Sequence, residues 1–279
     1  GSVALSRVRQ FFIFDRWLAR MVLEVGDRFV LKGGVALELR LTQARTTRDV
    51  DVRLSGDPTH LRSQLEGVAV RETGDYLSFT VAPDRHHPAI QGDGVIYQGQ
   101  RFRVQAQLAG KPYGDPFGLD VAHGDPILRA PDLVTTGDWL NFVGIAPAVV
   151  PVIPRESHVA EKLHAYTLPR DRENSRVKDL PDMALLARTG PFVAADVRQA
   201  IRQTFAFHKT HAVPAQVPSP PIAWGDAYRT MARDDGLPWP VLEAVQEAAR
   251  RFLDPVLADF EGTWEPISSS WRRQEPSAT

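Results

Sequence analysis

The stretch TTRDVDVRL, residues 46–54, places two aspartates one residue apart in a segment that otherwise reads as a short buried strand. Alternate side chains of a strand point to opposite faces, so Val50 and Val52 share one face while Asp49 and Asp51 share the other. Two neighbouring carboxylates repel each other, so the pattern predicts a bound cation. The alternative is an edge strand with one solvated face, where aspartate is tolerated.

Two glycines precede this strand. FVLK (29–32) is predicted to be a strand, and Gly33-Gly34 separates it from one to two helical turns over 35–41. Glycines at such a junction let the backbone approach a ligand closely, and the free N–H groups of the helix start favour an anion there. A plain tight turn is the alternative. A phosphate-facing turn followed by a D-x-D strand suits polymerase-type phosphoryl transfer, in which the turn holds a nucleoside triphosphate (NTP) and the carboxylates hold Mg²⁺ or Mn²⁺.

A third acid, Asp120, stands in the middle of the apolar segment FGLDVAHGD (117–125). Aspartate is depleted in strands, so a position in the middle of one asks for a partner. Asp120 is predicted to complete the metal site or to act as the base for an attacking hydroxyl. An acid that faces solvent from an edge strand is the alternative.

A further set of charges lies in the second half of the chain. Lys162 falls within a predicted helix over 156–168, and Asp179 begins another helix, preceded by Arg176 and Lys178. A lysine aimed at a triphosphate would neutralise charge that develops in the transition state. Taken singly, these residues are typical of surface charges.

The order of the predicted elements indicates an α/β fold. An amphipathic helix over 3–25 opens the chain, a helix over 58–72 follows the D-x-D strand, and further strands are predicted at YLSFTVA, GVIYQ, FRVQAQLA and FGLDVA, giving a sheet of about five strands. After about residue 150 the periodicity becomes helical, over 156–168, 178–189, 194–207, 224–234 and 239–260. We therefore expect an α/β sheet domain over 3–150 and an all-helical domain over 151–279, with the boundary within 146–154.

Composition excludes some classes of site. The net charge is −1, so any nucleic-acid-binding surface must be local. The sequence has no cysteine, which excludes disulfides, thiolate zinc sites and a cysteine nucleophile. The absence of an 18-residue apolar run and of a signal peptide predicts a cytoplasmic protein with no membrane partner, and we expect a monomer.

Five short motifs together resemble the nucleotidyltransferase toxins of the AbiEii/AbiGii type, which include the mycobacterial MenT toxins of MenAT toxin–antitoxin systems. The motifs are K-G-G-x-A-L-x-L-R, T-x-D-x-D, L-D-V-A-x-G-D, A-E-K-L-x-A and R-x-K-D-L-x-D, and they span about residues 29–187. The resemblance implies a DNA-polymerase-β-like nucleotidyltransferase sheet domain followed by a helical domain. It also implies Mg²⁺-dependent transfer of a nucleotide from an NTP, in some members to the 3′ end of tRNA, under the control of an antitoxin.

The resemblance also assigns residues. The phosphate-binding glycines fall on Gly33 and Gly34, the metal aspartates on Asp49 and Asp51, the motif lysine on Lys162 and the downstream aspartate on Asp179. Asp120 matches the third strand acid of the wider superfamily. Beside these residues, Lys32, Thr47 and Arg48 are predicted to contact the nucleotide. In some members a serine or threonine two residues before the first aspartate is phosphorylated, and Thr47 occupies that place.

The acceptor is predicted to be tRNA, bound by basic residues of the second half: Arg155, Arg176 and Lys178 first, then Arg170, Arg172, Arg198, Arg202 and Lys209. Acidic residues lie among them, so a solvated surface of mixed charge is the alternative. Two other functions fit the motifs. One is nucleotide transfer to a small molecule or to a protein hydroxyl, and the other is a non-catalytic nucleotide-binding module.

Overall fold

The computed structural model of the chain describes residues 2–41, 46–86, 88–89, 98–124, 129–170 and 176–273. The chain divides into two compact units: unit 1 comprises Gly1–Leu39 and Thr46–Ile153, and unit 2 comprises Arg40–Arg45 and Pro154–Thr279. The predicted boundary after residue 150 falls close to the division after Ile153. That the two units correspond to functional domains stays a prediction.

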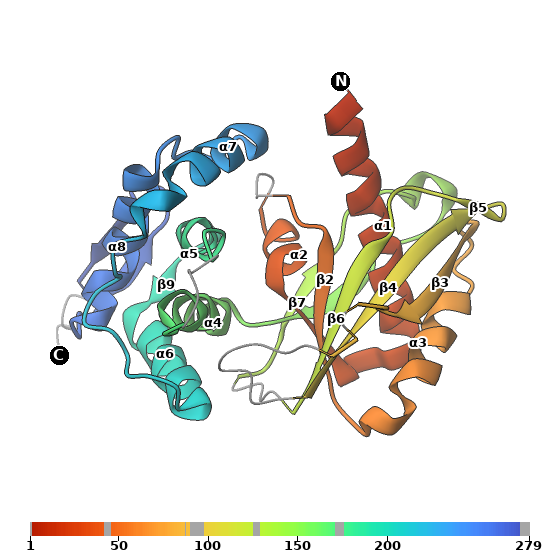
Figure 1. Cartoon of the computed structure of the whole chain (residues 1–279), viewed down its shortest axis with the longest axis horizontal. Coiled ribbons are helices and arrows are strands. Elements are labelled where there is room, and N and C mark those ends of the chain that lie inside the picture. The colour runs from red at the N-terminus through yellow and green to blue at the C-terminus, as the bar shows by residue number, and fades with distance from the viewer. Residues whose placement is uncertain are drawn as a thin grey trace, which may run out of the picture. The chain divides into compact units, whose positions relative to one another are not determined.

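Unit 1 is built around an eight-stranded mixed sheet (Figure 1). Its strands are β1 (Phe29–Lys32), β2 (Asp49–Leu54), β3 (Leu77–Pro83), β4 (Gln98–Leu108), β5 (Lys111–Pro112), β6 (Phe117–His123), β7 (Asp132–Thr135) and β8 (Val149–Val152). The order is β3-β4-β6-β2-β1-β8-β7, and β5 pairs with β4. The pairs β2–β6 and β1–β8 are parallel, and the other pairs are antiparallel. The predicted α/β class is confirmed.

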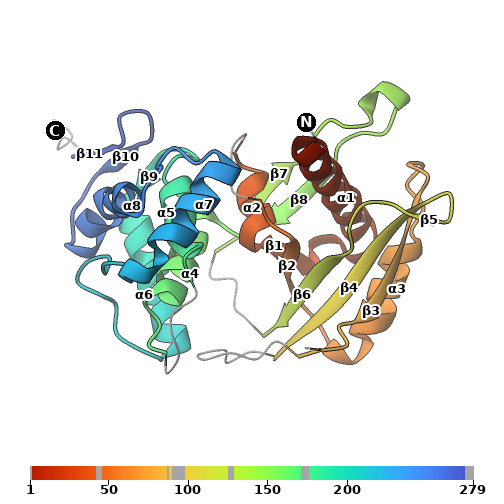
Figure 2. The same cartoon turned by 45° about the horizontal axis from the view of Figure 1, so that its top comes forward.

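Two long helices cover one face of this sheet (Figures 1 and 2). They are α1 (Ser2–Val25) and α3 (Leu61–Val70), and the short α2 (Gly33–Glu38) follows β1 directly. In α1 the buried residues Phe14, Trp17, Leu18 and Met21 recur at the spacing of one helical face. They pack in one core with apolar residues of α3 and of the sheet, so this face of the sheet is apolar and covered.

Unit 2 is mainly helical. Its helices are α4 (Arg155–Thr167), α5 (Asp179–Leu186), α6 (Ala194–His208), α7 (Gly225–Asp235) and α8 (Leu242–Leu257). It also contains a three-stranded antiparallel sheet of β9 (Phe192–Val193), β10 (Thr263–Glu265) and β11 (Ser270–Arg272), which corrects the expectation of an all-helical part. Strands of two or three residues are too short to carry an alternating pattern, so the sequence gives no signal for them.

The small sheet of unit 2 is held by aromatic packing. Phe252 of α8 lies between Phe192, Trp264 and Trp271, with ring centroids 5.2, 5.0 and 5.7 Å away. The indole N–H of Trp264 donates to the carbonyl of Ala187, and that of Trp271 donates to the carbonyl of Phe252. The hairpin of β10 and β11 therefore completes the core of unit 2.

Other expectations about elements also need correction. The segment 146–154, expected to be a boundary, contains β8, which pairs with β1 and β7. Pro151 argues against a strand, but β8 has a single registered pair with β1, so the missing N–H is tolerated. Residues 94–97 of the predicted strand GVIYQ lie outside the described residues.

In the described part of the chain, no helix combines the length and the apolarity that crossing a membrane requires.

Candidate functional site

The two aspartates of β2 lie on the face of the sheet opposite the helical layer. Val50 and Val52 are buried in the core, and Asp49 and Asp51 alternate with them along the strand. Strand β2 lies between β6 and β1, so the alternative of an edge strand is wrong. Asp49 is exposed and Asp51 is half-buried.

The glycine turn packs closely against the segment that carries the aspartates, because neither glycine has a side chain. Gly33 has φ +65°, and a Cβ at this position would overlap the Asp51 carboxylate. A Cβ on Gly34 would lie 2.8 Å from both Cβ and Oγ1 of Thr47. Both glycines are therefore required for packing within unit 1, because the segment 47–51 lies directly against them.

Thr47 joins the glycine helix to the aspartate strand. Its backbone N–H donates to Oε1 of Glu38 at the end of α2 (2.9 Å), and its hydroxyl donates to the carbonyl of Asp49 (3.3 Å). Thr47 is buried, whereas the neighbouring Arg48 is exposed. The turn, α2 and the start of β2 thus form one connected group.

A row of four charged residues crosses the sheet at this level. Lys32 of β1 is in register with Asp51 of β2, Asp51 with Asp120 of β6, and Asp120 with Arg101 of β4. Residues in register on adjacent strands share a face, so these four side chains and Asp49 are on the same side of the sheet. The sheet therefore brings the three predicted metal aspartates to one face, next to the glycine turn.

Asp120 is bound by Arg101 through both oxygens. Nε of Arg101 donates to Oδ1 and Nη2 donates to Oδ2, each at 2.6 Å. The Asp120 hydrogen bond raises the pKa of Arg101, and the negative charges of Asp120, Asp49 and Asp51 raise it further. Strand β6 lies between β4 and β2, so Asp120 is not an acid that faces solvent from an edge strand.

The aspartates of β2 suit a hard divalent cation in part. Mg²⁺ prefers carboxylate oxygens, which Asp49 and Asp51 offer from one strand face. Asp120 is a poor third ligand in this arrangement, because both of its oxygens already accept hydrogen bonds from the positively charged Arg101, which would repel a cation. Among the residues that the structure describes, no group of three or more His, Asp or Glu side chains has the geometry of a metal cluster.

Unit 2 contains a second charged group, centred on Lys162 of α4. Its Nζ lies 2.8 Å from Oδ2 of Asp182 and 3.2 Å from Oδ1 of Asp179, both on α5. Asp182 is 0% exposed and Asp179 is 3% exposed, so the alternative of a solvated surface charge is wrong for Asp179. Arg176 lies 3.9 Å from Oδ2 of Asp179. Two buried carboxylates thus share one ammonium group.

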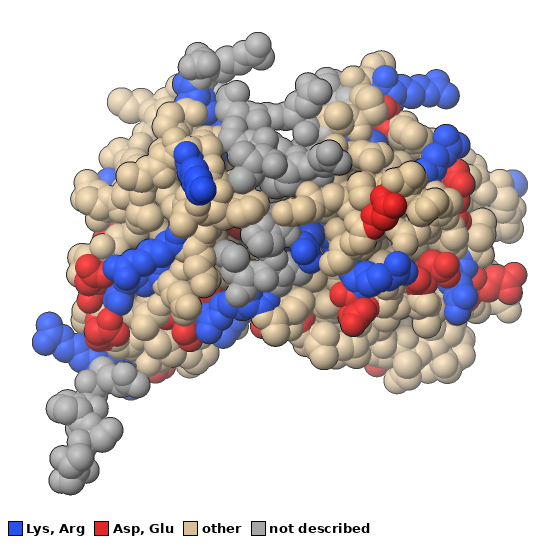
Figure 3. All heavy atoms as spheres, turned by 90° about the horizontal axis from the view of Figure 1, so that it is seen from below, with Lys and Arg blue, Asp and Glu red and all other residues tan. Residues whose placement is uncertain are grey.

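The predicted acceptor-binding residues lie in different environments. Arg176 and Lys178 are exposed, whereas Arg155 is half-buried, with its guanidinium over the Phe192 ring at 4.6 Å. Arg198 and Arg202 pair with acidic side chains of the segment 259–261, and Arg172 lies outside the described residues. On the face shown in Figure 3, basic and acidic side chains are interspersed over the described surface.

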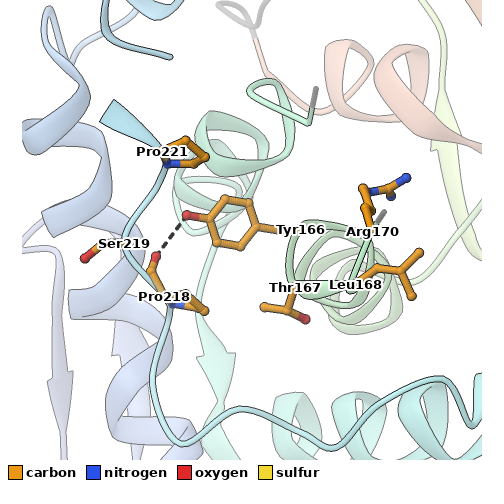
Figure 4. Close-up of a pocket in the computed structure, with 7 residues that line it drawn as sticks. All are labelled: Tyr166, Thr167, Leu168, Arg170, Pro218, Ser219 and Pro221. Atoms are coloured by element: carbon orange, nitrogen blue, oxygen red, sulfur yellow. Dashed lines mark hydrogen bonds between the residues drawn. The ribbon is translucent and has the colours of Figure 1, made fainter. Parts of the chain in front are cut away.

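The lining of a cavity in unit 2 includes none of the predicted catalytic, metal-binding or nucleotide-binding residues. The cavity has a volume of about 380 Å³ and is lined by Tyr166, Thr167, Leu168, Arg170, Pro218, Ser219 and Pro221 (Figure 4). The Tyr166 hydroxyl donates to the carbonyl of Pro218 (2.9 Å), which ties the end of α4 to the proline-rich segment VPAQVPSPP (213–221). This hydrogen bond gives the cavity wall a structural role.

Two residues of these charged groups were missed by reasoning from the sequence. Arg101 alternates with the buried Phe102 at the start of β4, and this period of two is the signal that could have placed it on the polar face. Asp182 stands in the motif R-x-K-D-L-x-D, but its burial against Lys162 depends on how α5 packs on α4.

Comparisons with known proteins agree with these observations. A family model described as nucleotidyl transferase AbiEii toxin, type IV TA system, matches residues 16–261. The structure of MenT4, a nucleotidyltransferase toxin from Mycobacterium tuberculosis H37Rv, is similar with a TM-score of 0.62 and 17% sequence identity over 94% of this chain and 87% of that chain. The structure of JHP933 from Helicobacter pylori has a TM-score of 0.44 and 13% identity over 87% of this chain and 93% of that chain. No match to a curated protein was found.

The similarity to MenT4 shows the fold, and the family match covers most of the chain. The predicted resemblance to AbiEii-type toxins is confirmed. Because the family model spans residues 16–261 of 279, the chain belongs to the AbiEii family of nucleotidyl transferase toxins, which is assigned to type IV toxin–antitoxin systems.

Proposed function

We propose that the chain is a Mg²⁺-dependent enzyme that transfers a nucleoside monophosphate from an NTP to the 3′ end of tRNA, so that translation stops unless an antitoxin intervenes. The observation that carries this proposal is the position of Asp49 and Asp51 on one face of β2, with Asp51 directly over the Gly33 turn. tRNA as the acceptor implies that the enzyme acts in the cytoplasm.

In this reaction the 3′-hydroxyl of the acceptor attacks the α-phosphorus of the NTP. A phosphorus–oxygen bond forms, the bond to the β-phosphate bridging oxygen breaks, pyrophosphate leaves, and the hydroxyl proton passes to solvent. Asp49 and Asp51 would hold Mg²⁺, which supplies neutralisation of phosphate charge when it is bound. Gly33, Gly34 and the neighbouring residues Lys32, Thr47 and Arg48 are proposed to contact the nucleotide.

Unit 2 is proposed to contribute further residues. Lys162 and Asp179 are assigned to nucleotide binding because they match the family motifs. Arg155, Arg176 and Lys178 are assigned to the acceptor. An antitoxin is proposed as the partner because the family belongs to toxin–antitoxin systems.

The direct test is a labelling assay. The chain is incubated with each α-³²P-labelled NTP and Mg²⁺, together with total tRNA, protein extract or an aminoglycoside in separate reactions. We expect label at the 3′ end of tRNA. Label only in protein or only in the small molecule would show that tRNA is not the acceptor. Nucleotide binding without any transfer would favour a non-catalytic module.

The matched variants are Asp49→Asn and Asp27→Asn. Asp49→Asn keeps the size of the side chain but removes its charge, and we expect transfer to fall by at least about 100-fold while the protein stays folded. Asp27 is exposed on the 3-10 turn Gly26–Arg28, and Asp27→Asn should transfer at the wild-type rate. A folded Asp49→Asn protein with full activity would contradict the assignment.

A further inference from the structure

The pairing of Asp120 with Arg101 conflicts with the role expected of a third metal aspartate. Both carboxylate oxygens accept hydrogen bonds from one guanidinium, Nε to Oδ1 and Nη2 to Oδ2, each at 2.6 Å. Such a two-bond arrangement is among the strongest that arginine and carboxylate form, and it fixes the carboxylate in orientation as well as in position. A cation that bound Asp120 would have to share these oxygens with the guanidinium and lie close to its positive charge.

The pair is held by the sheet itself. Arg101 and Asp120 are in register on the antiparallel strands β4 and β6, so their side chains start as nearest neighbours on one face. The Asp120 side chain is 14% exposed and that of Arg101 is 40% exposed. The carboxylate is therefore largely shielded from water, while the guanidinium keeps contact with solvent.

Charge explains why an arginine belongs at this position. Asp51 is in register with Asp120, and Asp49 precedes Asp51 on the same face, so three carboxylates are close together. Arg101 is paired with Asp120 and lies on the same face as Asp49 and Asp51, so its positive charge offsets part of the repulsion among the three carboxylates. Arg101 thus neutralises the charge of Asp120, as a bound cation otherwise would.

We propose that Arg101 is a positioning residue that holds Asp120 out of the cation site, so that the pair Asp49–Asp51 alone supplies the carboxylate ligands of the divalent metal. This inference rests on the proposed function, because it concerns the metal of the same reaction. It distinguishes this chain from a site in which three strand aspartates ligate metal together.

The first experiment compares two matched variants by Mn²⁺ binding, measured from the electron paramagnetic resonance signal of free Mn²⁺ without nucleotide. Asp51→Asn and Asp120→Asn make the same chemical change in neighbouring registered positions. We expect Asp51→Asn to weaken Mn²⁺ binding at least about tenfold, because it removes a ligand. Asp120→Asn should weaken binding clearly less than Asp51→Asn, because it changes the charge beside the site without removing a ligand.

The second experiment releases Asp120. Arg101→Met keeps the bulk of the side chain but removes its charge and both hydrogen bonds, so Asp120 becomes able to reach the cation. We expect Mn²⁺ to bind about threefold to tenfold more tightly. The double variant Arg101→Met/Asp120→Asn should lose this gain, because it also removes the released carboxylate, and Arg101→Lys separates that effect from the lost positive charge.

Two controls show whether a change in Mn²⁺ affinity comes from misfolding. Thermal unfolding of each variant shows that it is folded, and Arg101→Lys is a milder substitution at the same position. Lysine keeps the positive charge, so Arg101→Lys should remain folded. Because lysine cannot form the paired hydrogen bonds, this variant should bind Mn²⁺ with an affinity between those of wild type and Arg101→Met. An Asp120→Asn loss as large as that of Asp51→Asn would overturn the proposal. A gain in Arg101→Met that persists in the double variant would also overturn it.

These outcomes are separate from failure of the proposed function. Wild-type binding of Mn²⁺, together with an Asp120→Asn loss as large as that of Asp51→Asn, overturns only the role given to Arg101. A wild-type chain that binds no Mn²⁺ overturns the assignment of the Asp49–Asp51 cation site, and with it this inference, whereas the labelling assay decides the transfer reaction independently.

Discussion

The position of the Asp51 side chain requires that residue 33 has no side chain. The carboxylate of Asp51 fills the space that a side chain at position 33 would occupy, and Thr47 does the same at Gly34. A glycine pair chosen for phosphate binding would need an open backbone, but this pair is also needed so that β2 can lie against the turn. The motifs K-G-G and T-x-D-x-D therefore act as one structural group.

Gly33→Ala is expected to disturb this group directly. The new Cβ overlaps the Asp51 carboxylate and forces an alanine to φ +65°. We expect a loss of about 1–2 kcal/mol from the backbone conformation and a further loss of Mn²⁺ affinity and transfer, because Asp51 must move. Urea unfolding and the labelling assay measure the two effects.

Gly26→Ala is the control for Gly33→Ala. Gly26 has φ +67°, nearly the same backbone conformation, but a Cβ added there would meet nothing within 4 Å. It should lose a similar free energy of unfolding while keeping wild-type transfer. Equal losses of transfer in both alanine variants would show that the Asp51 contact has no functional effect.

Lys162→Met tests the buried charges of unit 2. The lysine pairs with Asp179 and with the fully buried Asp182, and its removal leaves these two carboxylates without their shared ammonium group. We expect a loss of about 3–5 kcal/mol of unfolding free energy, measured by urea denaturation. Arg202→Ala, which breaks an exposed pair with Asp259, should cost less than about 1 kcal/mol.

This stability effect changes how activity of Lys162 variants is interpreted. A folded Lys162→Arg protein keeps the positive charge, so weaker NTP binding in that variant would support a nucleotide contact. If Lys162→Met is as stable as wild type, the buried carboxylates do not depend on the lysine.

At the residue scale, the sequence predicts the aspartate face of β2 because alternation is a local property. The pair Arg101–Asp120 is different, because it depends on the register between β4 and β6. The same holds for Lys162 with Asp182, which come from two helices. Local patterns identify which residues are exceptional, and tertiary packing decides which of them meet.

At the scale of elements, α4 carries a histidine whose protonation opposes folding. His164 is stacked on His208 of α6 with ring centroids 4.2 Å apart, lies 4.9 Å from His211, and has Nε2 2.8 Å from the hydroxyl of Thr210. Burial first, and then the charges of His208 and His211, lower the pKa of His164 to about 4. The packing of α4 on α6 therefore requires neutral imidazole.

Unit 2 should lose stability as pH falls. The pKa of His164 is lower in the folded chain than the ordinary 6.5, so below pH 6.5 protons bind preferentially to the unfolded chain. The stabilisation is complete above pH 6.5 and decreases toward pH 4. At pH 5 we expect a loss of about 2 kcal/mol, measured by urea unfolding followed through tryptophan fluorescence.

The controls for this prediction are two histidine variants. His164→Gln should flatten the pH dependence between pH 6.5 and pH 5, although it lowers stability at neutral pH. His60→Gln removes an exposed histidine and should leave the pH dependence unchanged. An unchanged pH dependence in His164→Gln would assign the effect to other groups.

Periodic elements are the part of the fold that the sequence predicts well. The amphipathic helices from α1 to α8 and the alternating strand β4 have enough residues for a period to appear. Strands β7 to β11 have two to four residues each, and Pro151 stands inside β8. Such strands form because neighbouring elements offer backbone partners, which no local pattern reports.

At the scale of the whole molecule, net charge limits how the chain can bind RNA. Its formal charge is −1, so tRNA binding must come from a few local contacts. If Arg155, Arg176 and Lys178 contact phosphates, the slope of log affinity against log salt should be about −2. Lys178→Gln should reduce its magnitude by about 0.7, measured by fluorescence anisotropy of labelled tRNA over a series of KCl concentrations.

Arg229→Gln is the matched control in unit 2, because Arg229 is exposed and paired with Asp226. It should leave the salt slope unchanged. A flat salt dependence in the wild-type chain would exclude phosphate contacts by these three residues.

The ring cluster around Phe252 has a practical consequence for anyone who trims this polypeptide. The family match stops at residue 261, just before the hairpin that delivers Trp264 and Trp271 to that cluster, and it starts partway along α1, after Phe14. A fragment limited to residues 16–261 would lack Phe14, Trp264 and Trp271, and apolar surface that these side chains cover would be exposed to water. The limits of the family match therefore do not coincide with the limits of the packed core in this chain.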